Sequence, residues 1–532
     1  MSVNLSRTNS TTSKTAMKDS PGSSARGRVE VISLEGGGHD RIVQTTEELT
    51  GHKQELRVSM GLGALLALSF ANMAPTVAIN GSLSISMSSG GPLAVLWGWV
   101  IVAFICLAIA SSLAELCSAW PHPSGQAYWA YKLAPPAWAP FWSYWTAWMN
   151  IAGGHALIAA GAYIFAAGIL GIVIAYNPSY EERDWHLVLL YLGLLAVFFV
   201  VNLFIVRILD ACTKGFALIN ITSVLATIIA LAACAPVKQS PKWVFTEFIN
   251  ETGWSNSGLV FLLGLVQAGF VIIGFEASAH LCEEAHDAGR LAPLAIFGGT
   301  SLVAVVGLCW IITLLFCMGD LDSVLGSATG EPFYQILINA FNLNGATVAF
   351  LINLIVLGFA VIGIICASSR AVWAQARDKA FPGSVLFSRV NHRLQVPVYA
   401  CALQVIVPAI LGLIYLGSPT IFLAFFQLTT VGYMASYFIP VALLFFRGRH
   451  LLPHGIYWRM PDWLAMICNI VTLLYAPFIT VLFCIPNYYP VTSTNANYTS
   501  PIAAVAILIG TIGWFLECRR TFKEPSASHS LE

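Results

Sequence analysis

Apolar segments of about 20 residues recur along almost the whole of this 532-residue chain, and each is long enough to cross a membrane as an α-helix. We count twelve. They begin near Ser59, Pro92, Phe141, His186, Cys212, Ser257, Pro293, Leu343, Val396, Thr420, Trp463 and Pro501. Only 10% of the residues are charged, whereas soluble domains carry roughly 25%. The sequence therefore predicts an all-α integral membrane protein without a sizeable soluble domain.

The two ends of the chain differ from the rest. Residues 1–57 are rich in Ser, Thr, Gly and charge and have too little apolar surface to fold alone, so we expect a disordered cytoplasmic tail. They lack the charged start and apolar core of a cleavable signal peptide, which leaves the first span as the membrane-targeting signal. Residues 519–532 are expected to form a second cytoplasmic tail.

Lys and Arg residues are distributed unequally between the loops on the two sides of the membrane. Leaving the first 57 residues aside, fifteen Lys and Arg lie on the side of the termini, and three, Arg183, Lys238 and Lys242, lie on the other. Since cytoplasmic loops are enriched in Lys and Arg, both termini are predicted to be cytoplasmic. Two N-glycosylation sequons, at Asn250 and Asn497, fall in loops that this orientation places outside. We expect a eukaryotic glycoprotein of the plasma membrane.

The first span contains residues that disfavour a continuous helix. Pro75, Thr76, Asn80 and Gly81 lie at its mid-depth. Proline removes a backbone hydrogen bond and clashes with the preceding turn, while Gly and Asn give the backbone alternatives to helical bonding. The span is predicted to unwind between Ala74 and Gly81. A proline kink within a continuous helix is the other interpretation.

Span six, five spans later, has glycines at mid-depth and ends in GFEASAHLCEEAHDAG, which begins at Gly274. Interrupted helices at matching positions of two five-span halves point to an inverted repeat with a substrate site at its interface. The free N–H and C=O groups at such interruptions bind anions and cations, respectively. Such a site suits a small zwitterion or an organic cation.

Glu276 is the acid in this stretch. A carboxylate near the centre of a bilayer costs about 2.5–3.5 kcal/mol on insertion scales, so something must offset the cost. It either faces the cavity and senses a substrate amine or a proton, or it is a structural acid bonded to backbone N–H groups. His280, one turn further on, either interacts with this acid or lines the cytoplasmic exit. The acidic stretch from Glu283 to Asp287 is expected to be a solvated loop.

Five stretches resemble, in matching order, the amino acid/polyamine/organocation (APC) superfamily, and more narrowly its mainly fungal amino acid/choline transporter family. They are GHKQELRVSMGLGALLALSFA from Gly51, SGGPLAVLWGW from Ser89, SSLAELCSAWPHPSGQAYW from Ser111, GFEASAHLCEEAHDA from Gly274 and SSRAVWAQARDKAFPGSVLFSRVNHRLQVPVYA from Ser368. The resemblance implies a LeuT-like five-plus-five inverted repeat with discontinuous helices 1 and 6, two appended helices and alternating access. Residues 58–446 would form the transport core and residues 447–518 helices 11 and 12.

The resemblance also implies the site residues. The substrate would be bound by Thr76, Val77, Ala78 and Asn80 in span one and by Gly274, Phe275, Glu276, Ala277 and Ser278 in span six. Phe275 would flank the substrate unless it faces lipid. Aromatic residues that could cage a quaternary ammonium are Trp145, Trp148, Tyr163 and Tyr433. Helix packing or an interfacial belt would equally explain these four.

One departure from the family pattern concerns coupling. Many members of the superfamily carry a lysine midway along span five, and this span, GFALINITSVLATIIALAA, has none. Proton coupling would then pass through Glu276, His280 or His155, or be absent. Ser368 and Ser369 are a weaker candidate pair for a sodium ion. The basic residues Arg370, Arg377, Lys379, Arg389 and Arg393 are expected to set orientation and contact lipid headgroups.

The function predicted from these features is secondary active transport of a small amine-bearing solute: an amino acid, 4-aminobutyrate, choline or a related amine. Its partners would be the substrate, protons and the lipid bilayer, with no nucleic acid. No cofactor or metal is expected, since the twelve cysteines form no CxxC pair and no span carries HExxH. The chain also lacks the phosphate-binding loop of an ATP-driven pump. An exporter of an amine or alkaloid-like metabolite and a transporter-fold nutrient sensor remain open alternatives.

Overall fold

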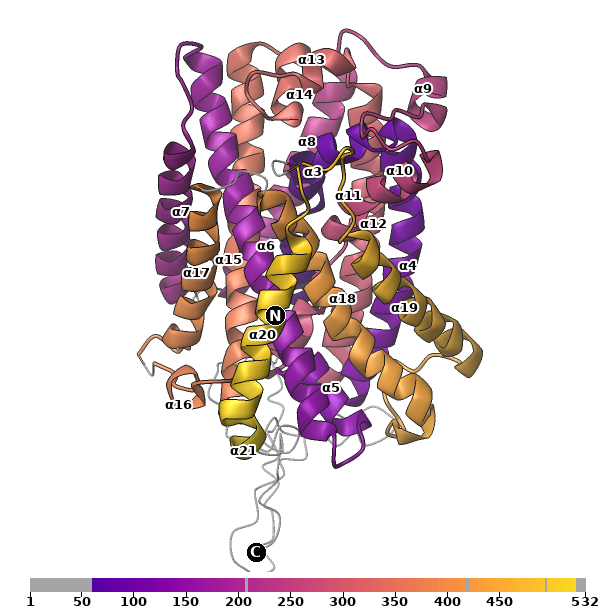
Figure 1. Cartoon of the computed structure of the whole chain (residues 1–532), viewed down its shortest axis with the longest axis vertical. Coiled ribbons are helices and arrows are strands. Elements are labelled where there is room, and N and C mark those ends of the chain that lie inside the picture. The colour runs from indigo at the N-terminus through magenta and orange to yellow at the C-terminus, as the bar shows by residue number, and fades with distance from the viewer. Residues whose placement is uncertain (1–59, 206–208, 392, 417–420, 493–494, 523–532) are drawn as a thin grey trace, which may run out of the picture. The chain divides into compact units, whose positions relative to one another are not determined.

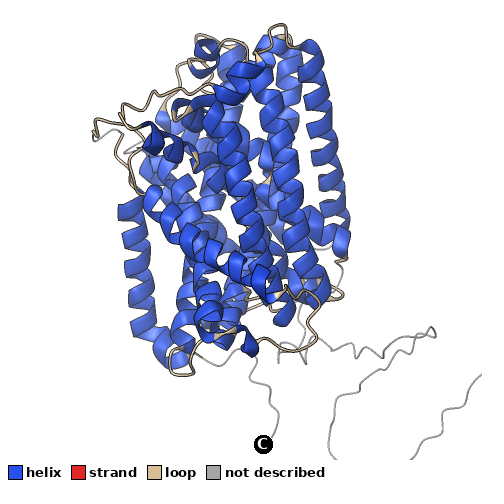
Figure 2. Ribbon diagram, turned by 90° about the vertical axis from the view of Figure 1, so that its right-hand side faces the viewer, coloured by secondary structure: helices blue, strands red, loops and turns tan. Residues whose placement is uncertain are grey.

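The computed structural model describes residues 60–205, 209–391, 393–416, 421–492 and 495–522. Within these residues the chain forms helices joined by loops, and no strand is drawn (Figure 2). The predicted tail at residues 1–57 lies outside the described residues, as do residues 523–532 of the second tail.

Eleven helical segments of the described chain are long and apolar enough to cross a membrane. They are α2 (Leu62–Met73) with α3 (Pro75–Ser88); α4 (Gly91–Ala119); α6 (Ala139–Tyr176); α7 (Asp184–Ile205); α10 (Ser257–Gly264) with α11 (Val266–Val271) and η2 (Phe275–Glu284); α12 (Ala288–Phe316); α15 (Leu343–Arg377); α17 (Val398–Leu413) with η3 (Ile414–Leu416); α18 (Ile421–Arg447); α19 (Asp462–Leu482); and α20 (Thr499–Gly513) with η5 (Trp514–Cys518) and α21 (Arg519–Thr521). A further apolar helix, α8 (Leu209–Cys234), lies where span five is predicted. Each helix begins close to its predicted start, because runs of about 20 apolar residues mark such helices directly.

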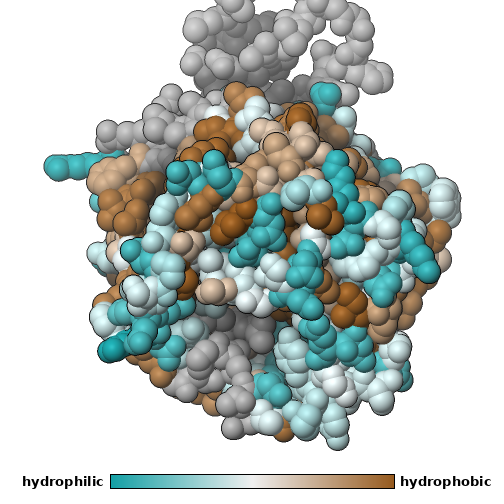
Figure 3. Space-filling model, turned by 90° about the horizontal axis from the view of Figure 1, so that it is seen from above, coloured by the Kyte–Doolittle hydropathy of each residue, from teal (hydrophilic) through white to brown (hydrophobic). Residues whose placement is uncertain are grey.

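Short helices lie at the two ends of the bundle (Figure 1). They are α5 (Gln126–Leu133), α9 (Pro241–Thr246), α13 (Leu321–Leu325), α14 (Pro332–Ala340), α16 (Ser384–Phe387) and η4 (Arg449–Leu451). Helices α9, α13 and α14 lie at one end, called here the α13–α14 end, and α5 and α16 lie at the other, the α5–α16 end. Figure 3 views the α13–α14 end and shows hydrophilic residues spread across it.

Helices α6 and α18 pack closely against each other through two glycines. A Cβ added at Gly432 of α18 would lie 2.7 Å from both the Cα and the N atom of Gly153 on α6. Small residues let helix backbones approach this closely in membranes, where packing and hydrogen bonds hold helices together. The glycine pair therefore fixes α6 against α18, and both helices contribute to the site described below.

Large apolar side chains cover the outward faces of several helices. Phe104 on α4, Leu189 on α7 and Leu474 on α19 are 72%, 60% and 68% exposed, respectively. In an integral membrane protein such faces contact lipid tails, which are as apolar as the side chains themselves.

Helix α19, the eleventh predicted span, is tied to α4 near the α5–α16 end. Glu115 of α4 is fully buried and pairs with Arg449, which also pairs with Asp462 at the start of α19. Deeper in the bundle, Ser112 of α4 donates to the side chain of Asn469 on α19 at 2.9 Å. Burying Glu115 is tolerated because its charge is paired and hydrogen-bonded.

Candidate functional site

The first span consists of α2 and α3, which meet at Ala74 in the left-handed region (φ 36°, ψ 59°). Pro75 opens α3, where a missing N–H costs little because the first N–H groups of a helix have no intrahelical partner. The N–H groups of Val77 and Ala78 both donate to the carbonyl of Ala74, at 3.1 and 3.0 Å. The predicted unwinding as far as Gly81 is therefore wrong. The interruption is one residue wide, and neither N–H group is free in this conformation.

The sixth span is interrupted after α11. Ile272 leaves the helical region (φ −88°, ψ 65°), and Gly274 adopts φ +81°, ψ 15° before the 3-10 helix η2 begins at Phe275. A positive φ is strained for residues with a Cβ atom, so glycine is the residue that fits this position. The N–H group of Gly274 has left the helical pattern and donates instead to the hydroxyl of Tyr437 on α18, at 3.2 Å.

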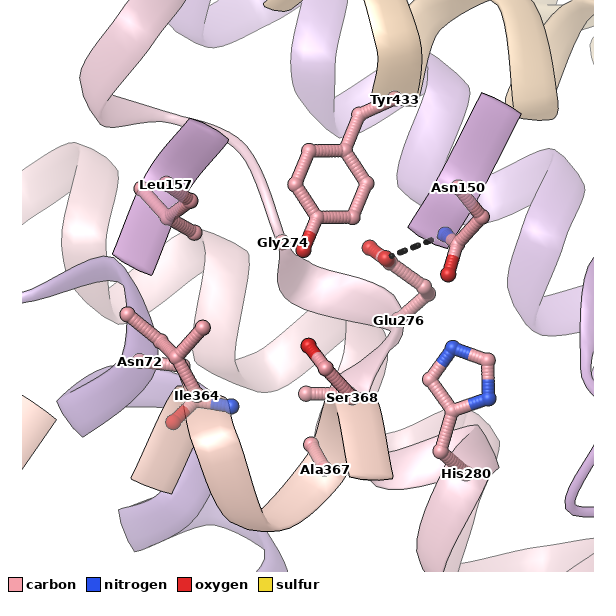
Figure 4. Close-up of a pocket in the computed structure, with 11 residues that line it drawn as sticks. Asn72, Asn150, Leu157, Gly274, Glu276, His280, Ile364, Ala367, Ser368 and Tyr433 are labelled. Carbon is pink, nitrogen blue, oxygen red and sulfur yellow. Dashed lines mark hydrogen bonds between the residues drawn. The ribbon is translucent and has the colours of Figure 1, made fainter. Parts of the chain in front are cut away.

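A small cavity, called here the inner cavity, lies where these interruptions meet α6, α15 and α18 (Figure 4). It is lined by Asn72, Asn150, Leu157, Gly274, Glu276, Ala277, His280, Ile364, Ala367, Ser368 and Tyr433. Its volume of about 10 Å³ is room for roughly one water molecule. In this conformation the inner cavity is closed around its polar side chains.

Glu276 is 2% exposed and is held by two neutral donors. Asn150 Nδ2 donates to Oε1 at 3.1 Å, and the hydroxyl of Tyr437 donates to Oε2. None of the residues that line the inner cavity in the described chain is a Lys or Arg. The carboxylate is thus hydrogen-bonded but lacks a cationic partner there, which leaves it able to take a proton or a ligand cation.

His280 lines the same cavity and has one ring nitrogen fixed. Its Nδ1 lies 2.8 Å from the carbonyl oxygen of Pro123. A carbonyl can only accept, so Nδ1 carries the hydrogen and, in the neutral ring, Nε2 carries the lone pair. Nε2 is buried and has no hydrogen-bond partner among the described residues. Figure 4 shows the imidazole pointing toward Glu276.

Tyr433 and Ser368 also line the inner cavity, where their side chains hydrogen-bond each other. Both hydroxyls lie against Gly154 of α6: an added Cβ there would be 2.9 Å from Ser368 Oγ and 3.5 Å from Tyr433 Oη. The missing side chain at Gly154 therefore leaves space for this pair. Ser368, the weaker sodium candidate, lies beside the acid in the inner cavity.

A larger cavity, the outer cavity, lies toward the α13–α14 end. It measures about 570 Å³ and is lined by Asn80, Gly81, Ser84, Ile85, Tyr163, Ile164, Ala167, Glu182, Asp184, Leu187, Thr329, Gly330, Glu331, Pro332, Tyr415 and Phe426. Ligand pockets commonly fall between 300 and 1,000 Å³, so a small solute fits here. At its wall, the side chain of Asn80 accepts from Trp310 at 2.9 Å and donates to Asn353 at 3.2 Å.

Carboxylates border the outer cavity in the loops beyond the membrane spans. Burial and, to a smaller extent, the negative charge of Glu182 raise the pKa of Glu331 to about 8. Burial also raises the pKa of Glu182, with a second contribution from Asp184. The rim of the outer cavity therefore carries carboxyl groups, and the pKa of Glu331, about 8, lies close to neutral pH.

The structure divides the predicted site residues between these two cavities. Gly274, Glu276, Ala277 and His280 line the inner cavity, and Asn80 lines the outer one. The remaining predicted residues line neither cavity: Thr76, Val77, Ala78, Phe275, Ser278 and His155. Phe275 is fully buried rather than lipid-facing.

The side chains of that second group pack around the site. The ring of Phe275 lies 5.0 Å from that of Tyr437. Ser278 Oγ donates to the carbonyl of Ala292 at 3.5 Å. His155 is 8% exposed, and its Nε2 has no hydrogen-bond partner among the described residues.

Sequence reasoning missed both partners of Glu276. Asn150 lies within the apolar third span, and Tyr437 lies within the tenth. A polar residue inside a span is itself a signal, because it is costly unless it faces the bundle interior. Asn150 carried this signal, because it is a polar residue within an apolar span. For Tyr437 no such signal existed, since tyrosine is common in membrane helices for other reasons.

Two acids predicted to be solvated are buried instead. Glu283 and Glu284, at the end of η2, are 2% and 3% exposed. Glu284 pairs with Arg370, and Glu283 pairs with Arg377 at 2.8 Å, both arginines being on α15. The solvated-loop prediction is wrong for these acids, and the predicted role in lipid contact is wrong for these two arginines. The ion pairs hold the end of η2 against α15.

The two tryptophans suggested as cage residues have packing roles. Trp148 donates from its indole nitrogen to the carbonyl of Ala506 on α20 at 2.9 Å. Trp145 packs edge-on against Phe141 and Tyr144. Of the four aromatic candidates, Tyr433 lines the inner cavity and Tyr163 the outer one.

Comparison with known proteins places this architecture among permeases. Residues 60–511 match the family model described as amino acid permease. A choline transporter of Saccharomyces cerevisiae is 31% identical over 484 residues, which cover 90% of this chain and 83% of the relative. Amino-acid permease BAT1 of Arabidopsis thaliana is 28% identical over 491 residues, covering 89% and 94%, respectively. Amino-acid permease 2 of Neurospora crassa is 29% identical over 442 residues, covering 82% and 81%.

The match extends over nearly all the described helices, including both interrupted spans and the residues around Glu276. These relatives are membrane transport proteins by name, and none is an enzyme. The chain is therefore a member of the amino acid permease family, in the APC superfamily.

Proposed function

We propose that the protein takes up a small amine-bearing solute across the plasma membrane, coupled to protons: an amino acid, 4-aminobutyrate, choline or a related amine. The observation that carries the proposal is the Glu276 carboxylate, which lines the inner cavity, is held by neutral donors and has no cationic partner among the cavity's described residues. A substrate ammonium or a proton supplies the missing positive charge. The names of the yeast, plant and Neurospora relatives, a choline transporter and amino-acid permeases, support this substrate class.

Transport proceeds by alternating access in this proposal. The outer cavity offers an entry from the α13–α14 end, whereas the pairs Arg370–Glu284 and Arg377–Glu283 close the path to the α5–α16 end. The interrupted spans, within an inverted-repeat core of residues 58–446, are the elements that rearrange. Release of substrate then requires both ion pairs to open or move. Thr76, Val77, Ala78, Phe275 and Ser278 would join the binding surface as α3 and η2 move.

The α13–α14 end faces outward and both termini are cytoplasmic in this arrangement. Two features support it: the asymmetry of Lys and Arg between loops, and the positions of Asn250 and Asn497, which flank the sixth and twelfth spans. Glycosylation at either asparagine would support passage through the secretory route to the plasma membrane.

Glu276 is the first choice for the coupling group among the three candidates. It lines the inner cavity together with His280, whereas His155 lines neither cavity. A proton on Glu276 would remove the negative charge that attracts a substrate ammonium. Binding of a proton and binding of an ammonium at this carboxylate are therefore linked. The missing lysine in span five leaves this role to such groups.

The proposal is tested by uptake in cells that lack their own permeases. Labelled choline, 4-aminobutyrate and neutral and basic amino acids are offered at several external pH values, with and without a protonophore. Proton symport gives faster uptake at acidic external pH and loss of uptake with the protonophore. Uptake insensitive to both would remove proton coupling, and no uptake of any compound would remove the transport proposal.

A further inference from the structure

The hydrogen-bonding character of the inner cavity restricts which amine it can hold. The fixed tautomer of His280 is the starting point: because Nδ1–H is committed to the carbonyl of Pro123, Nε2 presents a lone pair and no hydrogen. This nitrogen belongs to a side chain that is 5% exposed and has no partner among the described residues. A buried acceptor of this kind is costly to leave unpaired, so a ligand that donates a hydrogen to it gains.

Glu276 supplies the second acceptor. Its two oxygens accept hydrogen bonds from the neutral donors Asn150 and Tyr437, and the side chain of Gln126 is a third neutral partner. A carboxylate offers about four acceptor sites in all, so acceptor capacity remains for a ligand. Figure 4 shows Glu276 and His280 side by side at the same cavity. The two side chains therefore present acceptors of hydrogen toward one small volume, and one of them can carry a negative charge.

The rest of the lining contains little that would suit a quaternary ammonium. Such cations bind in cages of aromatic faces, because they have no N–H group to donate. Tyr433 is the single Phe, Tyr or Trp among the residues that line the inner cavity in the described chain, and its hydroxyl is bonded to Ser368. The ring of Phe275 instead packs at a tilt against the ring of Tyr437, with centroids 5.0 Å apart, and does not line the cavity.

We infer that the site selects a primary ammonium, an R–NH₃⁺ group, over its N-methylated forms, with His280 as a specificity-determining residue. One N–H of the ammonium donates to Glu276 and another to His280 Nε2. Each methyl group removes one donor, and a trimethylammonium leaves His280 Nε2 unpaired in a buried site. This inference rests on the proposed function, amine transport, and names the substrate class within it.

The test is a methylation series on the native protein in permease-deficient cells. The probes are 4-aminobutyrate and its N-methyl, N,N-dimethyl and N,N,N-trimethyl derivatives, with ethanolamine through choline as a second series. The inhibition constant of each compound is measured against uptake of whichever labelled amine is transported best. We expect it to rise along both series, by about tenfold or more between the primary and trimethyl members.

An equal or lower inhibition constant for the trimethyl members would overturn the inference while leaving amine transport intact. If no member of either series is transported or inhibits transport, the proposed function fails instead. The two failures are thus separate outcomes of one experiment.

Variants of His280 test its own part. His280→Leu removes the acceptor, whereas His280→Gln keeps an acceptor oxygen. The readout is the ratio of the trimethyl to the primary inhibition constant within each variant, because a ratio does not depend on the amount of protein at the surface. We expect the ratio to fall toward one in H280L and to stay closer to the native value in H280Q. An unchanged ratio in H280L would show that His280 does not set this preference. If H280L does not reach the surface, the native methylation series decides the matter alone.

Discussion

The hydroxyl of Tyr437 donates its hydrogen to the carboxylate of Glu276. The direction follows from the ionised carboxylate, which can only accept, and the same hydroxyl oxygen accepts a hydrogen from the N–H of Gly274 at 3.2 Å. The hydroxyl of Tyr437 on α18 thus has two roles. It accepts from the N–H of Gly274, which the interruption of span six leaves without a helical partner, and it orients the carboxylate of Glu276. The shape of the interruption and the position of the acid are tied together through Tyr437.

Tyr437→Phe is expected to impair transport strongly. The change removes a donor from Glu276 and leaves the N–H of Gly274 buried and unpaired, which costs about 1–3 kcal/mol. Initial uptake rates, normalised to surface protein, give the measurement. Tyr475→Phe is the matched control, because the hydroxyl of Tyr475 is buried without a hydrogen-bond partner among the described residues. Native uptake by Y437F would mean that the acid is positioned without this hydroxyl.

Gly432→Ala is expected to destabilise the protein by overpacking, at about 1–3 kcal/mol. The new Cβ would lie 2.7 Å from backbone atoms of Gly153, which cannot rotate away as a side chain can. Thermal unfolding of the detergent-solubilised protein measures the effect. Gly193→Ala in α7 is the control: nothing lies within 4 Å of its added Cβ, and alanine is favoured over glycine in a helix by about 0.5–1 kcal/mol. Equal behaviour of the two variants would contradict the close packing of α6 and α18.

Glu331 is expected to make stability depend on pH. Its pKa is raised from 4.5 to about 8, chiefly by burial. The folded state therefore holds this proton more tightly than the unfolded state does. The contribution of Glu331 to the free energy of unfolding is fully present below pH 4.5 and is lost as the pH rises to about 8. Between these pH values, the unfolding temperature should fall less with rising pH in Glu331→Gln than in the native protein. Parallel curves for the two proteins would argue against a half-buried Glu331 that titrates in this range.

The two sequons are expected to differ in use. Asn497 donates both hydrogens of its side-chain amide, to the carbonyls of Phe483 and Ile485 at 2.8 and 2.9 Å. An N-linked glycan would replace one of these hydrogens. Asn250 is exposed and donates one hydrogen, to the carbonyl of Trp254 at 2.8 Å, so it can carry a glycan and keep this bond.

Removal of N-glycans from the expressed protein should therefore shift its mobility in the native chain and in N497Q, but not in N250Q. A shift that persists in N250Q and disappears in N497Q would reverse this assignment. No shift in any of the three would leave the outside location of these loops without support from glycosylation.

The positions of the membrane helices could be predicted because each depends on a local property, a run of apolar residues bounded by polar ones. The interruption of span one was also visible in the sequence, at Pro75. Its width was not. The sequence indicated unwinding from Ala74 to Gly81. The side chain of Asn80 is instead bonded to Trp310 and Asn353, far along the chain, and does not compete with the local backbone.

The site could be predicted only in part, for a similar reason. Glu276 was identified because an acid inside an apolar span is costly, and that cost is local. Its partners Asn150 and Tyr437 lie 126 and 161 residues away in sequence. The pairing of Glu284 with Arg370, 86 residues apart, was hidden in the same way. Which helix faces which is a property of the packed bundle, and periodicity along one sequence does not specify it.

Glu276→Gln provides the most direct test of the account. Glutamine has nearly the same shape but cannot carry the negative charge that attracts an ammonium or accepts a proton. Uptake of the best transported amine, normalised to surface protein, is predicted to fall by about 30-fold or more, as expected for loss of one partner from a buried charge pair. Uptake at the native rate, with the native dependence on external pH, would show that Glu276 is a structural acid and would contradict the account.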